Sequence, residues 1–253
     1  MAGHSHFANI MHKKGRTDAI RGKAFSKISR LIMAAVRIGG PKPEDNPRLS
    51  LAIEKARAAN MPKDTIKRAI ARASGTTEGV DYVELTYEGY GPNGVAMLIE
   101  TLTDNRNRTG GEVRLIFDRN GGSLGAAGSV AWMFERKGEF EIPAAQTTED
   151  DLFELAVEAG AEDVALMEEG DPIFLVTSDV ASFEDVKRAL AAAELTTVRA
   201  ELTMVPKNIV DADEDTARKI MRVQGLFEDN DDVQNVTTNL DVSTEVAAKL
   251  AAE

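Results

Sequence analysis

The hydrophobic pattern of this 253-residue chain changes its period at about residue 80. Before that point, apolar residues recur every three or four positions, which is typical of amphipathic helices. After it, short runs with strand character alternate with helical stretches. The sequence therefore predicts a helical N-terminal domain followed by α+β domains.

Three helices are expected before residue 80. The first covers 17–38 and ends at a Gly-Gly-Pro sequence. The second covers 47–60, with Asn46 as its N-cap and a proline at its first position. The third covers 62–75. Many of their inward positions are alanine, so we expect a closely packed bundle with a small core.

Beyond residue 80, a β-hairpin is expected over 82–102, followed by a polar loop and a helix over 110–119. Residues 131–205 show the order β-α-β-β-α-β, which is the ferredoxin-like split βαβ motif. Within it we expect a turn at Lys137-Gly138 and a core position for Trp132, with a stacking platform as the alternative role of the tryptophan.

The predicted fold class is α+β with three domains. These are a basic three-helix bundle over 1–79, a discontinuous α+β sheet domain over 80–130 and 206–253, and an inserted acidic, ferredoxin-like domain over 131–205. The sheet domain is joined across the insertion because neither of its two pieces is a complete domain alone.

Charge is distributed unevenly along the chain. The first 75 residues hold sixteen Lys and Arg against five Asp and Glu, whereas the whole chain has a formal net charge of −12. Such asymmetry indicates a polyanionic partner for the basic part. The alternative is that the basic domain docks on its own acidic neighbours, and the two arrangements can alternate.

The first helix is expected to carry a cationic stripe. At 100° per residue, Arg16, Lys23, Lys27, Arg30 and Arg37 fall within about 80° of one another. No glutamates are interleaved as i,i+4 partners.

Arginines at the entrance of the 110–119 helix can bind phosphate or pair with neighbouring acids. The residues expected to contact nucleic acid are Lys13, Lys14, Arg16, Lys23, Lys27, Arg30, Arg37, Lys63, Lys67, Arg106 and Arg108.

Several classes of chemistry are excluded or disfavoured. The chain has no cysteine, no P-loop and no GxSxG or HExxH motif. Its three histidines lie near a single acid, Asp18, so neither a metal site nor a cofactor is expected. A metal-dependent nuclease is kept as an alternative, using the carboxylates of Asp81, Glu84, Glu88 and Asp104. The sequence predicts no membrane span, no secretory signal and a cytoplasmic location.

Several long strings resemble the YebC/PmpR family. They are GHSHFANIMHKKGRTDAIRGKAFSKISR, NPRLSLAIEKARAANMPKDTIKRAI, YEGYGPNGVAMLIE, LTDNRNRT and NGGSLGAAGSVAWMFERKG. The chain departs from the family at His6-Phe7, where a Lys-Trp pair is usual, and at Gly110-Gly111, where larger residues are usual. The first departure removes one cation from the segment that precedes the first helix. The second is expected to loosen the start of the 110–119 helix.

The resemblance implies three domains, the middle one discontinuous, and a cytoplasmic regulator without enzymatic activity. Many members of the family are described as DNA-binding transcriptional regulators, and this is our leading hypothesis. The alternative is a ribosome- or rRNA-binding translation factor that relieves stalling at proline runs, as implied by the mitochondrial translational activators of cytochrome oxidase subunit I. The oligomeric state is left open, and a monomer is compatible with the sequence. Reversing Lys23 and Arg30 to glutamate is expected to abolish binding without unfolding the protein.

Overall fold

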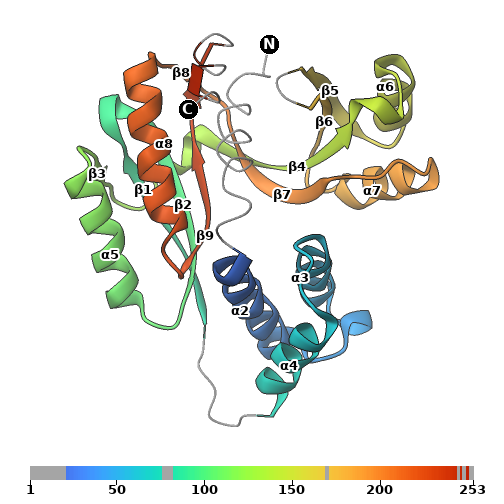
Figure 1. Cartoon of the computed structure of the whole chain (residues 1–253), viewed down its shortest axis with the longest axis horizontal. Helices are drawn as coiled ribbons and strands as arrows, with labels where there is room; N and C mark the ends of the chain where they lie inside the picture. Colours follow the sequence, from blue (N-terminus) through green and yellow to red (C-terminus); the bar gives the residue numbers. More distant parts are fainter. Residues whose placement is uncertain (1–20, 76–81, 169–170, 244–245, 247–248, 251–253) are drawn as a thin grey trace. The chain divides into compact units, whose positions relative to one another are not determined.

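The computed structural model describes residues 21–75, 82–168, 171–243, 246 and 249–250 (Figure 1). The chain forms two compact units. Of the described residues, one unit contains 21–75, 82–130 and 218–238, and the other contains those from 131 to 217 and from 239 on. Among the described residues, no helix combines the length and the apolar character that crossing a bilayer requires.

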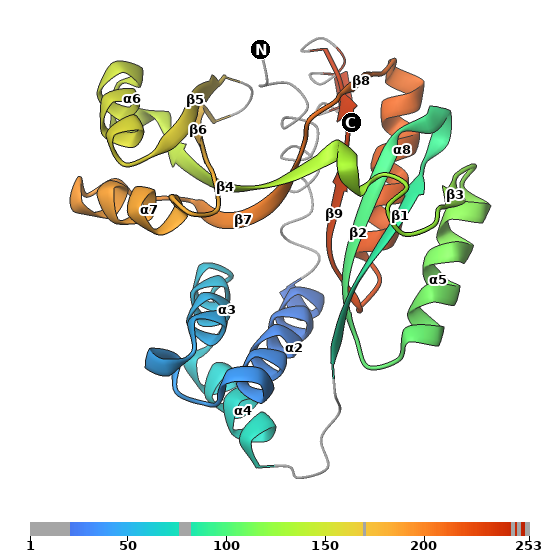
Figure 2. The ribbon, with the colours of Figure 1, turned by 180° about the vertical axis from the view of Figure 1, so that it is seen from behind.

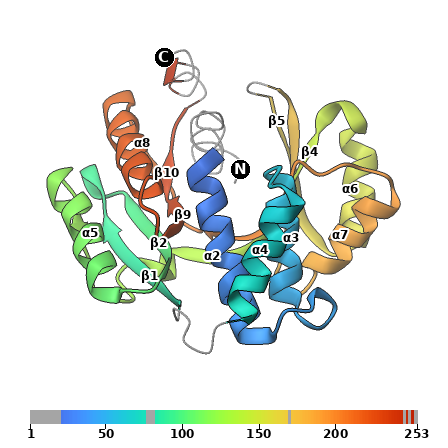
Figure 3. The same cartoon turned by 60° about the horizontal axis from the view of Figure 1, so that its bottom comes forward.

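The helical bundle of the first unit consists of α2 (Arg21–Gly39), α3 (Pro47–Ala58) and α4 (Lys63–Ser74), which pack together in Figure 3. A short 3₁₀ turn, η1 (Pro43–Asp45), connects α2 to α3. The predicted helices are confirmed here, except that 17–20 lie outside the described residues. The bundle has its own apolar core, with these fully or largely buried members: Ile28, Ile32, Ala35, Val36, Leu49, Ala52, Ile53, Ala56, Met61, Ile66, Ala69 and Ala73.

The buried side chain of Asn46 ties α2 to α3. Its Oδ1 accepts a hydrogen bond from the backbone N–H of Leu49, which is the expected N-cap. Its Nδ2 donates to the carbonyl oxygens of Ala35 and Gly40, at 2.8 and 2.9 Å. One polar residue thus satisfies backbone groups at the end of one helix and at the start of the next.

The first unit also holds an antiparallel sheet with strand order β3-β1-β2-β9. Its strands are β1 (Val83–Tyr90), β2 (Ala96–Thr103), β3 (Ser123–Leu124) and β9 (Val233–Thr238). The 3₁₀ turn η2 (Pro92–Gly94) joins the predicted hairpin. Helices α5 (Arg106–Arg119) and α8 (Glu214–Glu228) cover one face (Figure 1). A second core fills this layer, formed by Met97, Ile99, Val113, Phe117, Val223, Phe227, Val233 and Val236.

The predicted start of α5 at Gly110 is wrong by one turn. The helix begins at Arg106, because Asn105 is its N-cap and the side chain of Asn105 accepts from the backbone N–H of Arg108 at 3.1 Å. The end is as predicted. Gly121 adopts φ +75°, the left-handed conformation that terminates many helices.

The second unit contains an antiparallel sheet with strand order β5-β6-β4-β7 (Figure 2). Along the chain its elements are β4 (Phe134–Pro143), α6 (Glu149–Glu158), β5 (Ala161–Met167), β6 (Ile173–Ser178), α7 (Phe183–Ala192) and β7 (Arg199–Pro206). Short 3₁₀ turns, η3 (Ala131–Met133) and η4 (Ala144–Gln146), flank β4. A separate parallel pair joins β8 (Val210–Asp211) to β10 (Leu240–Asp241). The order of the larger sheet confirms the ferredoxin-like arrangement.

Two local predictions in this unit are wrong. Lys137-Gly138 is not a turn but the middle of the continuous strand β4. Gly138 is required there for close packing, because a Cβ would lie 2.5 Å from atoms of Phe183 and Ser178. Trp132 is not a core residue, since it lies in η3 and is 59% exposed.

Candidate nucleic-acid interface

Helix α2 presents three of the predicted cations to one segment of the same unit, Glu228–Asp232. Lys23 Nζ lies 3.4 Å from a carboxylate oxygen of Asp229. Lys27 Nζ donates to the carbonyl oxygen of Glu228 at 2.6 Å. Residues 23, 27 and 30 are spaced by four and three positions, so their side chains project from the same side of the helix. This geometry confirms that the three cations form a stripe, and it also gives the stripe an acidic partner within the chain.

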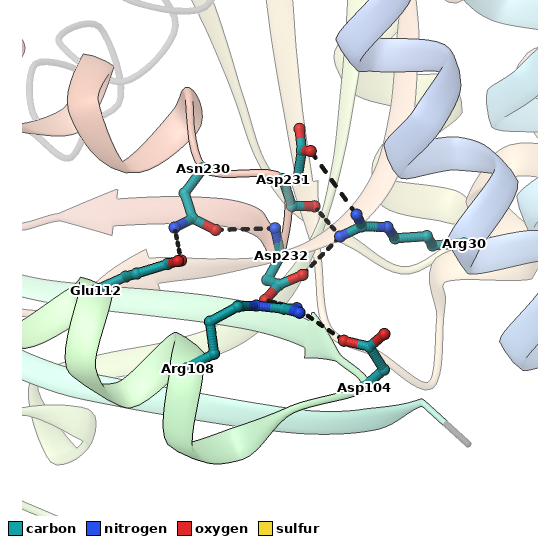
Figure 4. A pocket seen from close by; sticks show the side chains of 7 residues that line it. All are labelled: Arg30, Asp104, Arg108, Glu112, Asn230, Asp231 and Asp232. Carbon is teal, nitrogen blue, oxygen red and sulfur yellow. Dashed lines mark hydrogen bonds and ion pairs between the residues drawn. The ribbon is translucent and has the colours of Figure 1, made fainter. Parts of the chain in front are cut away.

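Arg30 makes the most specific of these contacts (Figure 4). Its Nη1 donates to Oδ1 of Asp232 at 2.6 Å and to the carbonyl oxygen of Asp231 at 2.7 Å. Its Nη2 lies 3.8 Å from a carboxylate oxygen of Asp231. The planar guanidinium thus spans side-chain and backbone oxygens, as it would span the oxygens of a phosphate.

Lys27 is largely withdrawn from water in this contact. Burial lowers the pKa of Lys27 from 10.5 to about 8, against the opposing effects of Glu228, Asp231 and Asp229. The nearby acids therefore compensate only in part for the lost hydration of the ammonium group.

The buried carboxylate of Asp232 is bound by three elements of the unit, α2, α5 and β2. While Oδ1 accepts from Arg30 on α2, Oδ2 accepts from Nη2 of Arg108 on α5 at 2.6 Å. The hydroxyl oxygens of Thr109 on α5 and Thr103 on β2 lie 2.7 and 3.0 Å from the same Oδ2. The segment that leads into β9 is therefore fixed to the end of the sheet through one side chain.

These contacts keep Asp232 ionised. Burial raises its pKa, but the hydrogen bonds from Arg108, Thr109 and Thr103 outweigh burial, so the pKa lies below its ordinary value of 3.8. The hydrogen bonds to Asp232 and Asp104 in turn raise the pKa of Arg108. Of the two predicted roles of Arg108, phosphate binding or pairing with acids, the structure shows pairing with acids. One of these acids is Asp104, at 2.7 Å.

A polar hollow of about 400 Å³ opens beside this network. Asn230 Nδ2 donates to Glu112 at 2.7 Å and Asn230 Oδ1 accepts from the N–H of Asp232, which fixes one wall (Figure 4). Its lining is formed by polar and charged residues, namely Arg30, Asp104, Arg108, Glu112, Asn230, Asp231 and Asp232. Acids outnumber arginines in this set, so the hollow itself does not favour an anionic ligand.

The carboxylates considered for a nuclease are used elsewhere. Glu84 pairs with Arg48, Asp104 pairs with Arg108, and Glu88 accepts from the backbone N–H groups of Gly128 and Val130. Asp81 lies outside the described residues. Within the described ranges, no group of three or more His, Asp or Glu is placed to hold a metal ion.

The remaining predicted cations are not gathered at the acidic segment. Lys63 and Lys67 lie one turn apart on α4 and are exposed, Arg106 is exposed at the start of α5, and Arg37 is half-buried. Lys13, Lys14 and Arg16 fall outside the described residues, as do the three histidines. The described interface therefore has two parts, a stripe on α2 in contact with acids and an open pair of lysines on α4.

The sequence allowed the basic domain to dock on acidic neighbours, but it did not identify 228–232 as the partner of α2. The segment is rich in acids, and the stripe has no glutamates interleaved among its cations. Nothing within a few residues of either segment couples them, because about two hundred residues separate Lys27 from Glu228. The sequence signal that could have identified this pairing is charge complementarity, since a run of acids can pair with a row of cations that lack acidic neighbours.

Comparison with known proteins covers both parts of the chain. The family model of the TACO1/YebC N-terminal domain matches residues 5–76. The family model of the TACO1/YebC second and third domain matches residues 82–240. A probable transcriptional regulatory protein of Geobacter sulfurreducens is 49% identical over 99% of this chain and 100% of its own length. One of the same name from Chlorobaculum tepidum is 47% identical over the full length of both.

A solved structure shares the fold. The crystal structure of a conserved hypothetical protein from Aquifex aeolicus superimposes with a TM-score of 0.83 at 45% sequence identity. The match covers 94% of this chain and 97% of that protein. The fold described above is therefore shared with an experimentally determined structure of a similar sequence.

Proposed function

Because the chain belongs to the TACO1/YebC family, we propose that it regulates gene expression by binding nucleic acid through its basic helical bundle. Its curated relatives are named as probable transcriptional regulators, which supports a regulatory role and favours duplex DNA as the ligand. In this proposal the protein acts by binding nucleic acid and does not catalyse a reaction.

The observation that carries this proposal is the row of cations along α2. Lys23, Lys27 and Arg30 bind carbonyl and carboxylate oxygens of the turn that connects α8 to β9. A phosphate backbone offers a similar row of anionic oxygens. The exposed Lys63 and Lys67 on α4 add cations to the same bundle.

The contacts of the bundle predict recognition of backbone rather than of base sequence. Base readout in the major groove depends on side chains such as arginine, lysine, asparagine or glutamine that are aimed at base edges. The three cations of α2 that contact 228–232 instead bind carbonyl and carboxylate oxygens. We therefore expect weak sequence preference and a strong dependence on salt.

Affinity for duplex DNA is expected to fall steeply with ionic strength, with a log–log slope of about −4 to −7. Reversing both exposed lysines, as Lys63→Glu with Lys67→Glu, should weaken binding roughly tenfold at moderate salt and make the slope shallower by about 2. Fluorescence anisotropy of a labelled duplex across a salt series measures both quantities.

A matched control reverses two exposed cations of the other unit, Arg188→Glu with Lys207→Glu, and so makes the same change in net charge. Equal losses in the two double variants would show that the α4 lysines have no specific role. A flat salt response of the wild-type protein would rule out backbone binding. The exposed lysines replace Lys23 and Arg30 in this test, because reversing Arg30 would place a carboxylate against Asp232.

The same titration with single-stranded and duplex RNA distinguishes a transcriptional regulator from a translation factor. A transcriptional regulator should bind duplex DNA at least as tightly as RNA at one salt concentration. A preference for RNA, together with co-sedimentation with ribosomes, would favour the translation-factor alternative. Incubation with Mg²⁺ or Mn²⁺ and branched DNA addresses the nuclease alternative, for which we expect no cleavage.

A further inference from the structure

We propose that Glu228–Asp232 is an internal competitor that occupies the cationic stripe of α2 and is displaced when a nucleic acid binds. This inference rests on the proposed function and adds its regulation. In the closed arrangement, the oxygens of this acidic segment take the positions that phosphate oxygens would take on Lys23, Lys27 and Arg30. The protein would then bind its ligand only after this intramolecular contact opens.

The acidic segment is held in place without help from α2. Oδ2 of Asp232 is bound by Arg108, Thr103 and Thr109, all of which belong to the sheet part of the unit. Asn230 is anchored to Glu112 on α5. Of the two carboxylate oxygens of Asp232, only Oδ1 is bound by the helical bundle, through Arg30. When α2 leaves, water can replace Arg30 while the segment keeps its shape.

The contact between the bundle and the sheet is polar and therefore reversible. The bundle core and the sheet core are separate apolar clusters without a shared residue. The described contacts of the stripe with Glu228–Asp232 are ion pairs and hydrogen bonds. To open these contacts, a polyanion has to compete with charges and carbonyl groups.

The closed contact also leaves one cation poorly solvated. Lys27 is withdrawn from water in exchange for a backbone carbonyl, which carries no formal charge. Its pKa of about 8 shows that the ammonium form loses stability in the closed arrangement. The charges that face Lys27 are Lys23 on α2 and Glu228, Asp229 and Asp231 of the acidic segment. A phosphate, with a full negative charge on its oxygens, would be a better partner.

A reversible cross-link tests this competition directly. The chain has no cysteine, so Lys23→Cys with Asp229→Cys introduces the only two thiols, at positions whose native side chains lie 3.4 Å apart. A short bis-maleimide with a central disulfide joins them and holds the contact closed, and a reductant cleaves the linker. We expect the cleaved protein to bind a labelled DNA duplex at least about fivefold more tightly than the closed protein.

The matched control places the same linker between Asp185→Cys and Arg188→Cys, an exposed ion pair of α7 in the other unit. This control removes the same charges, and its affinity should not change on cleavage. If the Lys23–Asp229 linker also leaves the affinity unchanged, the competition does not exist. If no form binds DNA or RNA, the proposed function fails as well, so the two failures are distinguishable.

A second pair of variants needs no linker. Asp229→Asn with Asp231→Asn removes two exposed acids that face the stripe and leaves Asp232 intact. Glu149→Gln with Asp150→Asn makes the same change in net charge on α6. The first variant should bind duplex at least about fivefold more tightly than the second. Equal affinities would show that the gain is only one of net charge and would overturn the inference.

Discussion

Replacing Asp232 with alanine is expected to lower the free energy of unfolding of its unit by about 2–4 kcal/mol. The carboxylate is only 3% exposed and is bound by two arginines and two threonine hydroxyls. Hydrogen bonds to a charged group contribute about 1.5–3 kcal/mol each, and removing one partner of a buried pair leaves the others unsatisfied. Arg108 is 42% exposed and recovers some hydration, which limits the loss.

The control for Asp232 is its neighbour. Asp231 is 58% exposed and interacts with Arg30 at 3.8 Å, so Asp231→Ala should change the stability by less than about 1 kcal/mol. Urea denaturation followed by circular dichroism measures both variants. Equal losses would show that Asp232 is not the residue that fixes the acidic segment to the sheet.

The contribution of Asp232 should also depend on pH. Its pKa in the folded protein lies below the ordinary value of 3.8, so the ionised side chain stabilises the fold above that value. The stabilisation is lost as the pH falls through the folded-state pKa, because the carboxyl must then be protonated in both states. We expect the difference in unfolding free energy between wild type and Asp232→Ala to be constant near neutral pH and to shrink below about pH 4. A difference that does not shrink as the pH falls below about 4 would contradict this origin.

The predictable parts of the fold were those encoded by local pattern. The helices of the bundle follow from apolar residues at three- and four-residue spacing, and Asn46 is the cap that its position before Pro47 indicates. The ferredoxin-like order follows from the alternation of strand and helix patterns. In each case the residues that decide the structure are close together in the sequence.

The features that escaped prediction depend on contacts between distant residues. Gly138 lies within a strand because Phe183 packs against its backbone, whereas its sequence neighbours indicate a turn. The α2 stripe follows from helix geometry, but its acidic partner does not. Lys23, Lys27 and Arg30 share one side of the helix by spacing alone, and only the folded chain brings Asp229 and Asp232 to them.

The bundle that carries the proposed interface should be sensitive to the loss of one core side chain. Leu49 is fully buried among small residues, so Leu49→Ala is expected to destabilise the bundle by about 3 kcal/mol. A folded unit of this size has only about 3–8 kcal/mol of stability in total, so much of the bundle would unfold at moderate temperature. The duplex affinity should fall with it, because α2 and α4 would no longer hold their cations in register.

The matched substitution is Leu152→Ala in helix α6 of the ferredoxin-like domain. Leu152 is also fully buried, but it belongs to the separate core that Phe140 and Val176 share. A similar loss of stability is expected there, with little change in duplex affinity at temperatures where the bundle remains folded. Thermal unfolding and anisotropy titrations on both variants separate the two effects. If Leu152→Ala weakens binding as much as Leu49→Ala does, nucleic-acid binding does not reside in the helical bundle alone.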